Sequence, residues 1–315
     1  MSAVGAPLIG REAELRRLRA AWSRARGGFG GVVVVSGEPG IGKTTLVDVI
    51  AGEIAKDGGN VARGRAWEAG VAPAYFPLWP CLRALGLPPI EAGGDDFRRW
   101  EEVLAALAGA SGERPIAWVV EDLHAADAQT LDLLTFVSHP ARSLALLVLV
   151  TTRDADPRLD ELKLRRIARI ARDAEQIVLP PLDREQVAAL VKSRFSAVPD
   201  ALLDELVQRT AGNPLFVAEC SRGLAGAPDL RFVKLPQTLR SSVLERVELL
   251  PAATRAVLDD AAVLGDEAFS GVLARMGKTQ PATVIDALVP ALRAGILFEL
   301  APGRFRFTHA LVREV

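Results

Sequence analysis

The residues with the clearest chemical potential are a run of glycines followed by a lysine and a threonine. Residues 37–45, Gly-Glu-Pro-Gly-Ile-Gly-Lys-Thr-Thr, match the spacing G-x-x-x-x-G-K-[ST]. Glycines let the backbone bend so that several N–H groups point at one anion, and a helix beginning there adds its positive dipole end. The pattern predicts nucleotide binding, with Lys43 reaching the β- and γ-phosphates and the Thr44 hydroxyl binding Mg²⁺. The predicted binding residues of this loop are Glu38, Pro39, Gly40, Ile41, Gly42, Lys43, Thr44 and Thr45.

Two adjacent acids form the second candidate group. Glu121 and Asp122 directly follow the apolar run 116–120, which is typical of a buried strand. Ligands of parallel sheets lie at the carboxyl ends of the strands. Downstream of a phosphate loop, such a pair predicts a Mg²⁺ ligand and a residue that orients the attacking water. The alternative is an acidic turn or a helix cap, and the phosphate loop favours the catalytic interpretation.

A third polar group follows another apolar run. Thr151, Thr152 and Arg153 come after residues 144–150, which predict a fully buried strand. A cationic group at the end of that strand would face the γ-phosphate from a neighbouring strand. We therefore include Arg153 with Lys43, Glu121 and Asp122 among the predicted catalytic residues, the alternative being a surface arginine.

The elements that must position these groups alternate between strands and helices. Strands are predicted at 32–36, 61–67, 116–120, 144–150 and 176–180, with helical patterns between them. This order predicts an α/β fold with a doubly wound parallel sheet, of the P-loop NTPase type. Helices are then predicted at 183–195, 200–210 and 215–224, and at 238–250, 252–264 and 281–294, before two short strands within 296–307. We predict a nucleotide-binding domain over 1–181, a helical lid over 182–235 and a winged helix over 236–315.

Composition narrows the class of protein. The 315 residues are 50% hydrophobic and 24% charged, with a formal net charge of −1, so the basic excess of a dedicated nucleic-acid surface is missing. The arginines of the first helix and of residues 159–172 are therefore interpreted as solvated faces. Cys81 and Cys220 are predicted to be buried free thiols. With no signal peptide and no apolar run long enough to span a bilayer, the sequence predicts a cytoplasmic protein.

The motifs occur together in a familiar order. Residues 8–15 (Leu-Ile-Gly-Arg-Glu-Ala-Glu-Leu), the phosphate loop, residues 121–127, Thr152-Arg153 and residues 212–216 (Gly-Asn-Pro-Leu-Phe) resemble STAND-type AAA ATPase modules. These are signal-transduction ATPases with numerous domains, and the chain is most similar to the module of large ATP-binding LuxR-type transcriptional regulators. The resemblance implies a slow ATPase that switches between an ADP-bound closed state and an ATP–Mg²⁺ open state that forms homo-oligomers.

The resemblance also implies roles for single residues. Gly10 and Arg11 would lie over the adenine, Arg153 would read the γ-phosphate, and Pro214 of the lid would pack against the adenine. His309 would contact the β-phosphate of ADP from a winged helix that acts as a clamp, although a lone histidine there is otherwise a capping or core group.

The sequence departs from the family pattern at two positions. Glu121 stands where aspartate is commoner, and Ala125 replaces a common aromatic. The longer acid leaves the division of roles between Glu121 and Asp122 open.

The sequence also leads to predictions about partners and about alternative functions. Because the chain ends inside a predicted helix, we expect effector and sensor domains beyond residue 315, with any DNA bound through such a domain and no membrane contact. The alternative is a DNA-binding AAA+ ATPase of the replication-initiator type, for which Arg304 and Arg306 on the hairpin are the only indication. A small-molecule kinase is disfavoured, since no acceptor site is evident and a lid plus winged helix has no use there.

Overall fold

The chain is divided into two compact units. The computed structural model describes residues 8–67, 72–86, 90, 93, 96–156, 159–193, 198–224 and 237–315. The first unit contains the residues up to Arg153 together with the segment that ends at Leu179. The second unit contains residues 154–156 and the chain from Pro180 onward. The predicted boundary between lid and winged helix, at 235 and 236, lies outside the described residues.

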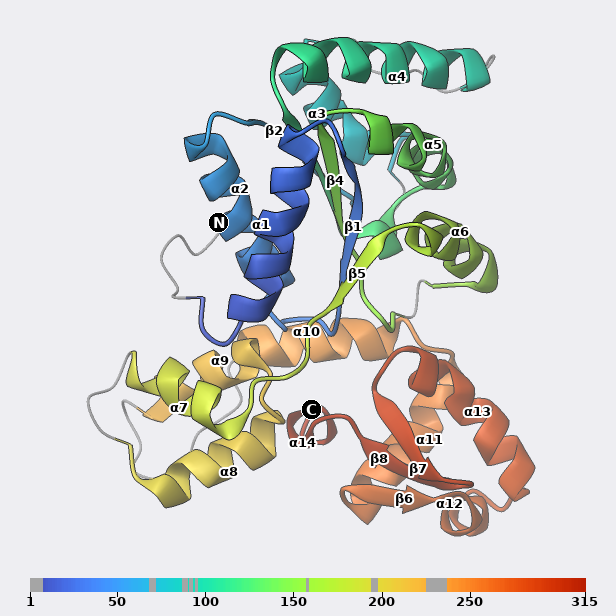
Figure 1. Ribbon diagram of the computed structural model, residues 1–315. Coiled ribbons are helices and arrows are strands. Elements are labelled where there is room, and N and C mark those ends of the chain that lie inside the picture. Colours follow the sequence, from blue (N-terminus) through green and yellow to red (C-terminus); the bar gives the residue numbers. More distant parts are fainter. Residues whose placement is uncertain are drawn as a thin grey trace. The chain divides into compact units, whose positions relative to one another are not determined.

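The first unit is built on a parallel sheet of five strands in the order β2-β3-β4-β1-β5 (Figure 1). The strands are β1 (Gly31–Ser36), β2 (Asn60–Arg65), β3 (Ile116–Glu121), β4 (Leu146–Thr151) and β5 (Glu175–Val178). All five predicted strands are confirmed, and the predicted α/β class with them. β2 ends two residues earlier than predicted, at Arg65.

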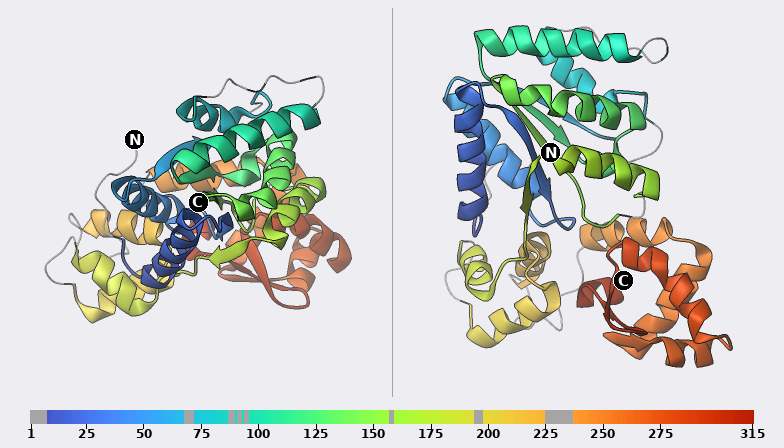
Figure 2. Two further views of the ribbon diagram at one scale, coloured as in Figure 1. Left: turned by 45° about the horizontal axis from the view of Figure 1, so that its top comes forward. Right: turned by 45° about the vertical axis from the view of Figure 1, so that its right-hand side comes forward.

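Helices cover both faces of this sheet, which is why the central strands are continuously apolar rather than alternating (Figures 1 and 2). Val33 and Val35 of β1 pack with α1 (Glu12–Arg26) and α2 (Lys43–Lys56). Val32 and Val34 face the opposite core. That core is completed by α3 (Trp79–Ala84), α4 (Asp96–Glu113), α5 (Ala128–Ser138), α6 (Glu161–Arg172) and the short helices η1 (Phe76–Leu78), η2 (Leu123–Ala125) and η3 (Pro140–Ser143).

The same parity holds in β2 and β3. Ala117 and Val119 belong to the core on the α1 and α2 side, so Glu121 is directed to that side as well. Gly64 lies on the other face, where the ideal Cβ of an added side chain would come 1.6 Å from the carbonyl oxygen of Pro77. Arg63 and Arg65, on either side of it, therefore face α2.

The second unit combines helices with a small antiparallel sheet in the order β6-β8-β7. Its helices are α7 (Arg184–Lys192), α8 (Asp200–Thr210), α9 (Pro214–Leu224), α10 (Gln237–Glu248), α11 (Ala252–Leu264), α12 (Ser270–Met276), α13 (Pro281–Arg293) and α14 (Ala310–Arg313). Its strands are β6 (Glu267–Phe269), β7 (Leu297–Ala301) and β8 (Arg304–Phe307). The predicted hairpin is confirmed as β7 and β8, whereas β6 and α12 were not predicted.

The arginines within α1 are exposed, in agreement with the solvated face predicted for this helix. Arg17 and Arg24 of α1 both pair with Glu175 of β5, and Arg19 pairs with Glu53 of α2. These exposed pairs attach α1 to its neighbours in the first unit. None of the helices in the described ranges combines the length and apolar composition that crossing a bilayer requires.

Candidate nucleotide-binding site

The phosphate loop joins β1 to α2. Gly40 and Gly42 have φ values of 79° and 101°, a left-handed conformation that favours glycine. Gly42 is the N-cap of α2, so the helix begins at Lys43 and the N–H groups of its first turn lie at the end of the loop. This is the local geometry that binds phosphate in proteins.

Lys43 is held inside the loop. Its Nζ donates hydrogen bonds to the carbonyl oxygens of Gly37 (2.7 Å) and Glu38 (2.8 Å). The residue is only 7% exposed. The loop therefore encloses a positive charge at the place where a nucleotide would bring its phosphates.

Arg11 attaches the segment before α1 to the loop. Its Nη2 donates to the carbonyl oxygen of Ile41 at 3.1 Å, and the residue is buried. Burial lowers the pKa of Arg11, while Glu14 and Glu12 act in the opposite direction. Gly10, with φ of 67°, lets the chain turn just before this contact. Arg11, predicted from the family resemblance alone, thus lies against the phosphate loop.

The two acids occupy different environments. The Glu121 side chain is 2% exposed, and its Oε2 accepts a hydrogen bond from Thr44 Oγ1 at 3.0 Å. Asp122 is less buried and has a left-handed backbone with φ of 63°. Its N–H donates to Thr151 Oγ1 of β4 at 3.0 Å. The structure therefore brings Glu121, rather than Asp122, to the threonine of the loop.

A magnesium ion fits the oxygens of Thr44 and Glu121. Hydroxyl and carboxylate oxygens are the donors that Mg²⁺ prefers. In the described ranges no group of three or more His, Cys, Asp or Glu side chains could hold a metal by itself. A cation bound by Thr44 and Glu121 would thus take its other ligands from nucleotide phosphates and water, as is usual for Mg²⁺.

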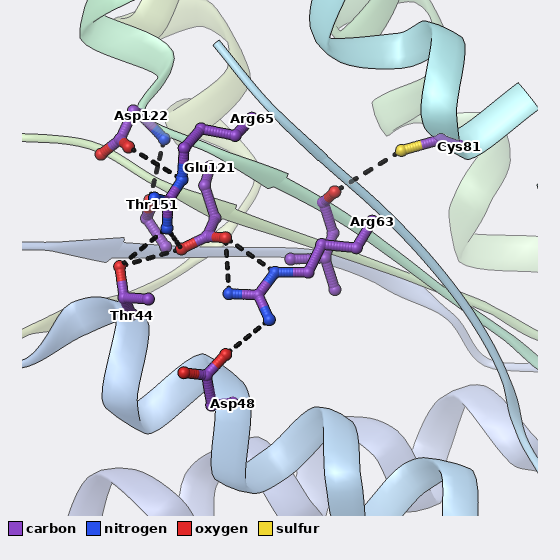
Figure 3. A network of polar contacts seen from close by, with 9 residues as sticks. Thr44, Asp48, Arg63, Arg65, Cys81, Glu121, Asp122 and Thr151 are labelled. Atoms are coloured by element: carbon purple, nitrogen blue, oxygen red, sulfur yellow. Dashed lines mark hydrogen bonds and ion pairs between the residues drawn. The ribbon is translucent and has the colours of Figure 1, made fainter. Parts of the chain in front are cut away.

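Two arginines that the sequence analysis missed enclose Glu121 (Figure 3). Arg63 contacts Glu121 Oε1 through Nε (2.7 Å) and Nη2 (2.6 Å), and it also pairs with Asp48 of α2. Burial lowers the pKa of Arg63, but the hydrogen bond to Asp48 and the charge of Glu121 outweigh it, so the pKa is raised. Arg63 is thus a permanent cation between two carboxylates.

Arg65 contacts the other side of the same carboxylate. Its Nη2 lies 2.9 Å from Glu121 Oε2 and 3.3 Å from Thr44 Oγ1. Its Nε lies 3.4 Å from Asp122 Oδ2. The sequence contained a partial signal, because positions 63 and 65 share one face of a predicted strand. It did not contain the register that pairs Arg65 with Glu121.

Arg153 lies at the predicted edge of the sheet. β4 pairs with β1 on one side and β3 on the other, so its carboxyl end lies between the strand before the loop and the strand bearing the acids. Thr152 N–H donates to the carbonyl oxygen of Val35 at 3.0 Å, which continues the pairing up to Arg153. Its γ-phosphate sensor role remains a prediction.

Pro214 and His309 belong to the second unit. Pro214 is the first residue of α9, and His309 is the N-cap of α14. The His309 ring packs edge-on against Phe216 of α9, with 5.0 Å between ring centroids, and the histidine is buried. Arg209 of α8 pairs with Glu314 at 2.9 Å. Pro214 and His309 are thus linked through α9, because Pro214 begins that helix and His309 packs on it. Their contacts with nucleotide remain predictions.

A family model matches the first part of the chain. Residues 7–150 match the family model of the AAA ATPase domain. An uncharacterized protein of Rhizobium meliloti (strain 1021) is 25% identical, over 99% of this chain and 35% of that protein. The chain therefore spans about a third of the length of this relative.

Solved structures support the fold over nearly the whole chain. The Walker-type ATPase of Pyrococcus abyssi is 15% identical with a TM-score of 0.69, covering 98% of this chain and 95% of that chain. The ORC2 protein of Aeropyrum pernix, solved in ADPNP–ADP complexes, is 17% identical with a TM-score of 0.62, covering 98% and 93%. The fold is a P-loop α/β core followed by a helical and winged-helix-like region.

Proposed function

Because residues 7–150 match an AAA ATPase domain, we propose that this chain binds ATP and ADP and hydrolyses ATP slowly as a signalling switch. The observation that carries the proposal is the joint geometry of the phosphate loop and β3. The loop holds the ammonium of Lys43, and its Thr44 hydroxyl is hydrogen-bonded to the buried Glu121. A threonine and an acid in contact beside a phosphate loop form the magnesium side of an ATPase site.

Each residue has a distinct part in the proposed reaction. Lys43 binds the β- and γ-phosphates, and Thr44 and Glu121 hold the ion. The ion, when bound, neutralises charge that develops on the phosphate oxygens. Asp122, nearer the surface, orients the attacking water, and Arg153 stabilises the γ-phosphate. Such catalysis consists of positioning and charge stabilisation, so a site that awaits charge from a partner turns over slowly.

The switch itself is proposed from the family resemblance and is supported by the second unit. His309 packs on α9, the helix that begins at Pro214, and Arg209 pairs with Glu314. The region proposed as lid and the end of the winged-helix region are therefore in contact. We propose that ADP favours a closed state, that ATP–Mg²⁺ favours an open state that forms homo-oligomers, and that gene regulation is the output.

The first experiment identifies the ligand. The purified chain is denatured and the released nucleotide is separated by chromatography, with ADP expected. Lys43→Ala should abolish binding of ATP and ADP, whereas Lys56→Ala, at the exposed far end of the same helix, should leave it unchanged. Unchanged ATP affinity in Lys43→Ala would overturn the site. Fast hydrolysis by a monomer without retained ADP would argue against a switch.

The alternative is a DNA-binding ATPase of the replication-initiator type. Its support is the fold shared with the ORC2 protein of Aeropyrum pernix. The hairpin arginines argue against it, because Arg304 and Arg306 both pair with Glu267, which reduces the positive charge of that face. A fluorescence anisotropy titration with duplex DNA separates the two proposals. The initiator predicts binding that weakens steeply with salt, and the switch predicts none.

A further inference from the structure

We propose that the Arg65 guanidinium occupies the metal side of the site before Mg²⁺–nucleotide binds and has to leave it when the ion arrives. Arg63, by contrast, stays in place and positions Glu121. This inference rests on the proposed nucleotide site, and it assigns to β2 a control over the magnesium requirement. The two arginines are two residues apart, but they contact different oxygens of the Glu121 carboxylate (Figure 3).

Arg65 contacts both oxygens that are predicted to hold the ion. Its Nη2 lies 2.9 Å from Glu121 Oε2 and 3.3 Å from Thr44 Oγ1, while those two oxygens are themselves 3.0 Å apart. One cationic nitrogen thus satisfies the acceptors that a metal ion would need. Two positive charges a few ångströms apart repel each other strongly in a partly buried site. Arg65 and a divalent cation therefore compete for the same oxygens.

Arg63 contacts only the opposite oxygen. Its Nε and Nη2 both donate to Glu121 Oε1, and its Nη1 pairs with Asp48 of α2. The two oxygens of the Glu121 carboxylate therefore have different partners. Arg63 fixes Oε1, and Oε2 is directed to Thr44. This division suits the longer side chain at position 121, because Arg63 limits the freedom that an additional methylene gives the carboxylate.

The two side chains also differ in how easily they can leave. The Arg65 side chain is 51% exposed and belongs to the last residue of β2, whereas that of Arg63 is 33% exposed. When Arg65 turns into solvent, Glu121 keeps its pair with Arg63, so no buried charge loses all its partners. Removing Arg63 takes away both donors to Oε1. Moving the Arg65 side chain away from Glu121 therefore costs less free energy than moving that of Arg63.

Displacement of Arg65 reaches the second acid as well. Arg65 Nε lies 3.4 Å from Asp122 Oδ2, so the same movement ends this ion pair. The residue proposed to orient water is thus paired with Arg65 until the ion is in place. Arg65 is a positioning residue by this argument, acting through Glu121 and Asp122.

The test measures the magnesium dependence of ADP binding by isothermal titration calorimetry, without turnover. ADP is titrated into the full chain in EDTA and then at stepwise higher free Mg²⁺, and the half-effective Mg²⁺ concentration is compared. We expect Arg65→Gln to lower that concentration about threefold to tenfold, the range expected for losing partly exposed ion pairs. Arg172→Gln, on the exposed end of α6, should match the wild type.

Arg63→Gln separates competition from simple loss of charge. This substitution removes one positive charge that lies beside the Glu121 carboxylate, but Arg65 keeps its contacts with Glu121 Oε2 and Thr44 Oγ1. Competition therefore predicts no lowering of the half-effective Mg²⁺ concentration, whereas a pure charge effect predicts the same lowering as in Arg65→Gln. Circular dichroism checks that each variant is folded, and Arg63→Met, which also removes the charge, replaces Arg63→Gln if the latter unfolds.

The outcomes distinguish this inference from the proposed function. If the wild type binds no ADP in any condition, the proposed function fails and the inference fails with it. If the wild type binds ADP with a clear Mg²⁺ dependence, and Arg65→Gln has the same midpoint or a higher one, only the inference is overturned. The inference is also overturned if Arg63→Gln and Arg65→Gln lower the half-effective Mg²⁺ concentration equally. The effect would then depend on the loss of one positive charge and not on the position of Arg65 beside the metal ligands.

Discussion

Glu121 is the residue on which the interior of the site depends. Its nearly unexposed carboxylate faces Arg63, Arg65 and Thr44. In Glu121→Gln the two arginines would face each other across a neutral amide. We expect a loss of about 1–3 kcal/mol in the free energy of unfolding, less than for a fully buried pair because both arginines reach solvent. Urea denaturation followed by circular dichroism measures it.

Asp122→Asn is the matched control for that experiment. Asparagine tolerates the left-handed backbone at position 122, and this side chain is more exposed than that of Glu121. We expect its stability to stay within about 0.5 kcal/mol of the wild type. If Glu121→Gln is as stable as Asp122→Asn, the buried network does not contribute as argued.

The two cysteines give a second prediction at the residue scale. Burial raises the pKa of Cys81 to about 12 and that of Cys220 to about 11. Both thiols are free and stay protonated at pH 8, and the thiolate is the reactive form. A disulfide reagent at pH 8 should label neither cysteine in the folded chain and both after denaturation. Rapid labelling of the native protein would contradict the burial of either thiol.

Single residues differed in how well the sequence predicted them. Lys43, Thr44, Glu121 and Asp122 could be predicted as site residues because each lies next to a recognisable strand or glycine pattern. Arg63 and Arg65 were missed because Glu121, the acid that both contact, lies more than fifty positions later in the chain, on a strand whose neighbour the sequence does not reveal.

At the scale of elements, β2 depends on a glycine. A Cβ at Gly64 would come 1.6 Å from the carbonyl oxygen of Pro77, which is backbone and not a movable side chain. We expect Gly64→Ala to cost about 1–3 kcal/mol or more through overpacking. It should also displace the two arginines and change the Mg²⁺ dependence of ADP binding. Thermal unfolding gives the stability.

Gly52→Ala supplies the contrast. Gly52 lies within α2, on its exposed side, with open space around its Cβ position. Alanine there should stabilise the chain by about 0.5–1 kcal/mol, since glycine is unfavourable inside a helix. Similar losses in both variants would show that the effect at Gly64 is not one of local crowding.

The elements themselves were largely predictable. Fully buried strands appear as uninterrupted apolar runs, so β1, β3 and β4 were found with small errors at their ends. β6 has three residues, too few to show an alternating pattern, and it forms only by pairing with β8. A strand that owes its existence to a distant partner leaves little trace in its own sequence.

At the scale of the whole molecule, the second unit is held together by contacts between distant segments. Phe216 of α9 is buried against His309, which precedes α14. Phe216→Ala should cost about 3–5 kcal/mol within this unit, because it leaves a cavity. Hydrogen exchange should become faster at the amides of α14 and remain unchanged in β3, which belongs to the first unit.

Leu215→Ala is the control for that measurement. Leu215 is the neighbouring residue of α9 but is 40% exposed, so its loss should change exchange in α14 very little. Faster exchange in β3 of Phe216→Ala would show that the two units unfold together. The sequence indicated helices and a hairpin in this region, but not which of them share a unit, since packing between segments a hundred residues apart has no local signature.

The tripeptide Arg63-Gly64-Arg65 has a consequence for the divergence of related proteins. Its three positions carry two unrelated constraints, because the outer side chains face the acids and the middle position has no room for a Cβ beside the backbone of Pro77. Substitution at 63 or 65 changes how the site handles a cation, whereas substitution at 64 harms the fold itself. Among descendants of a common ancestor, the glycine should therefore persist where the arginines have been exchanged, and exchanges at 65 should accompany changes at 121.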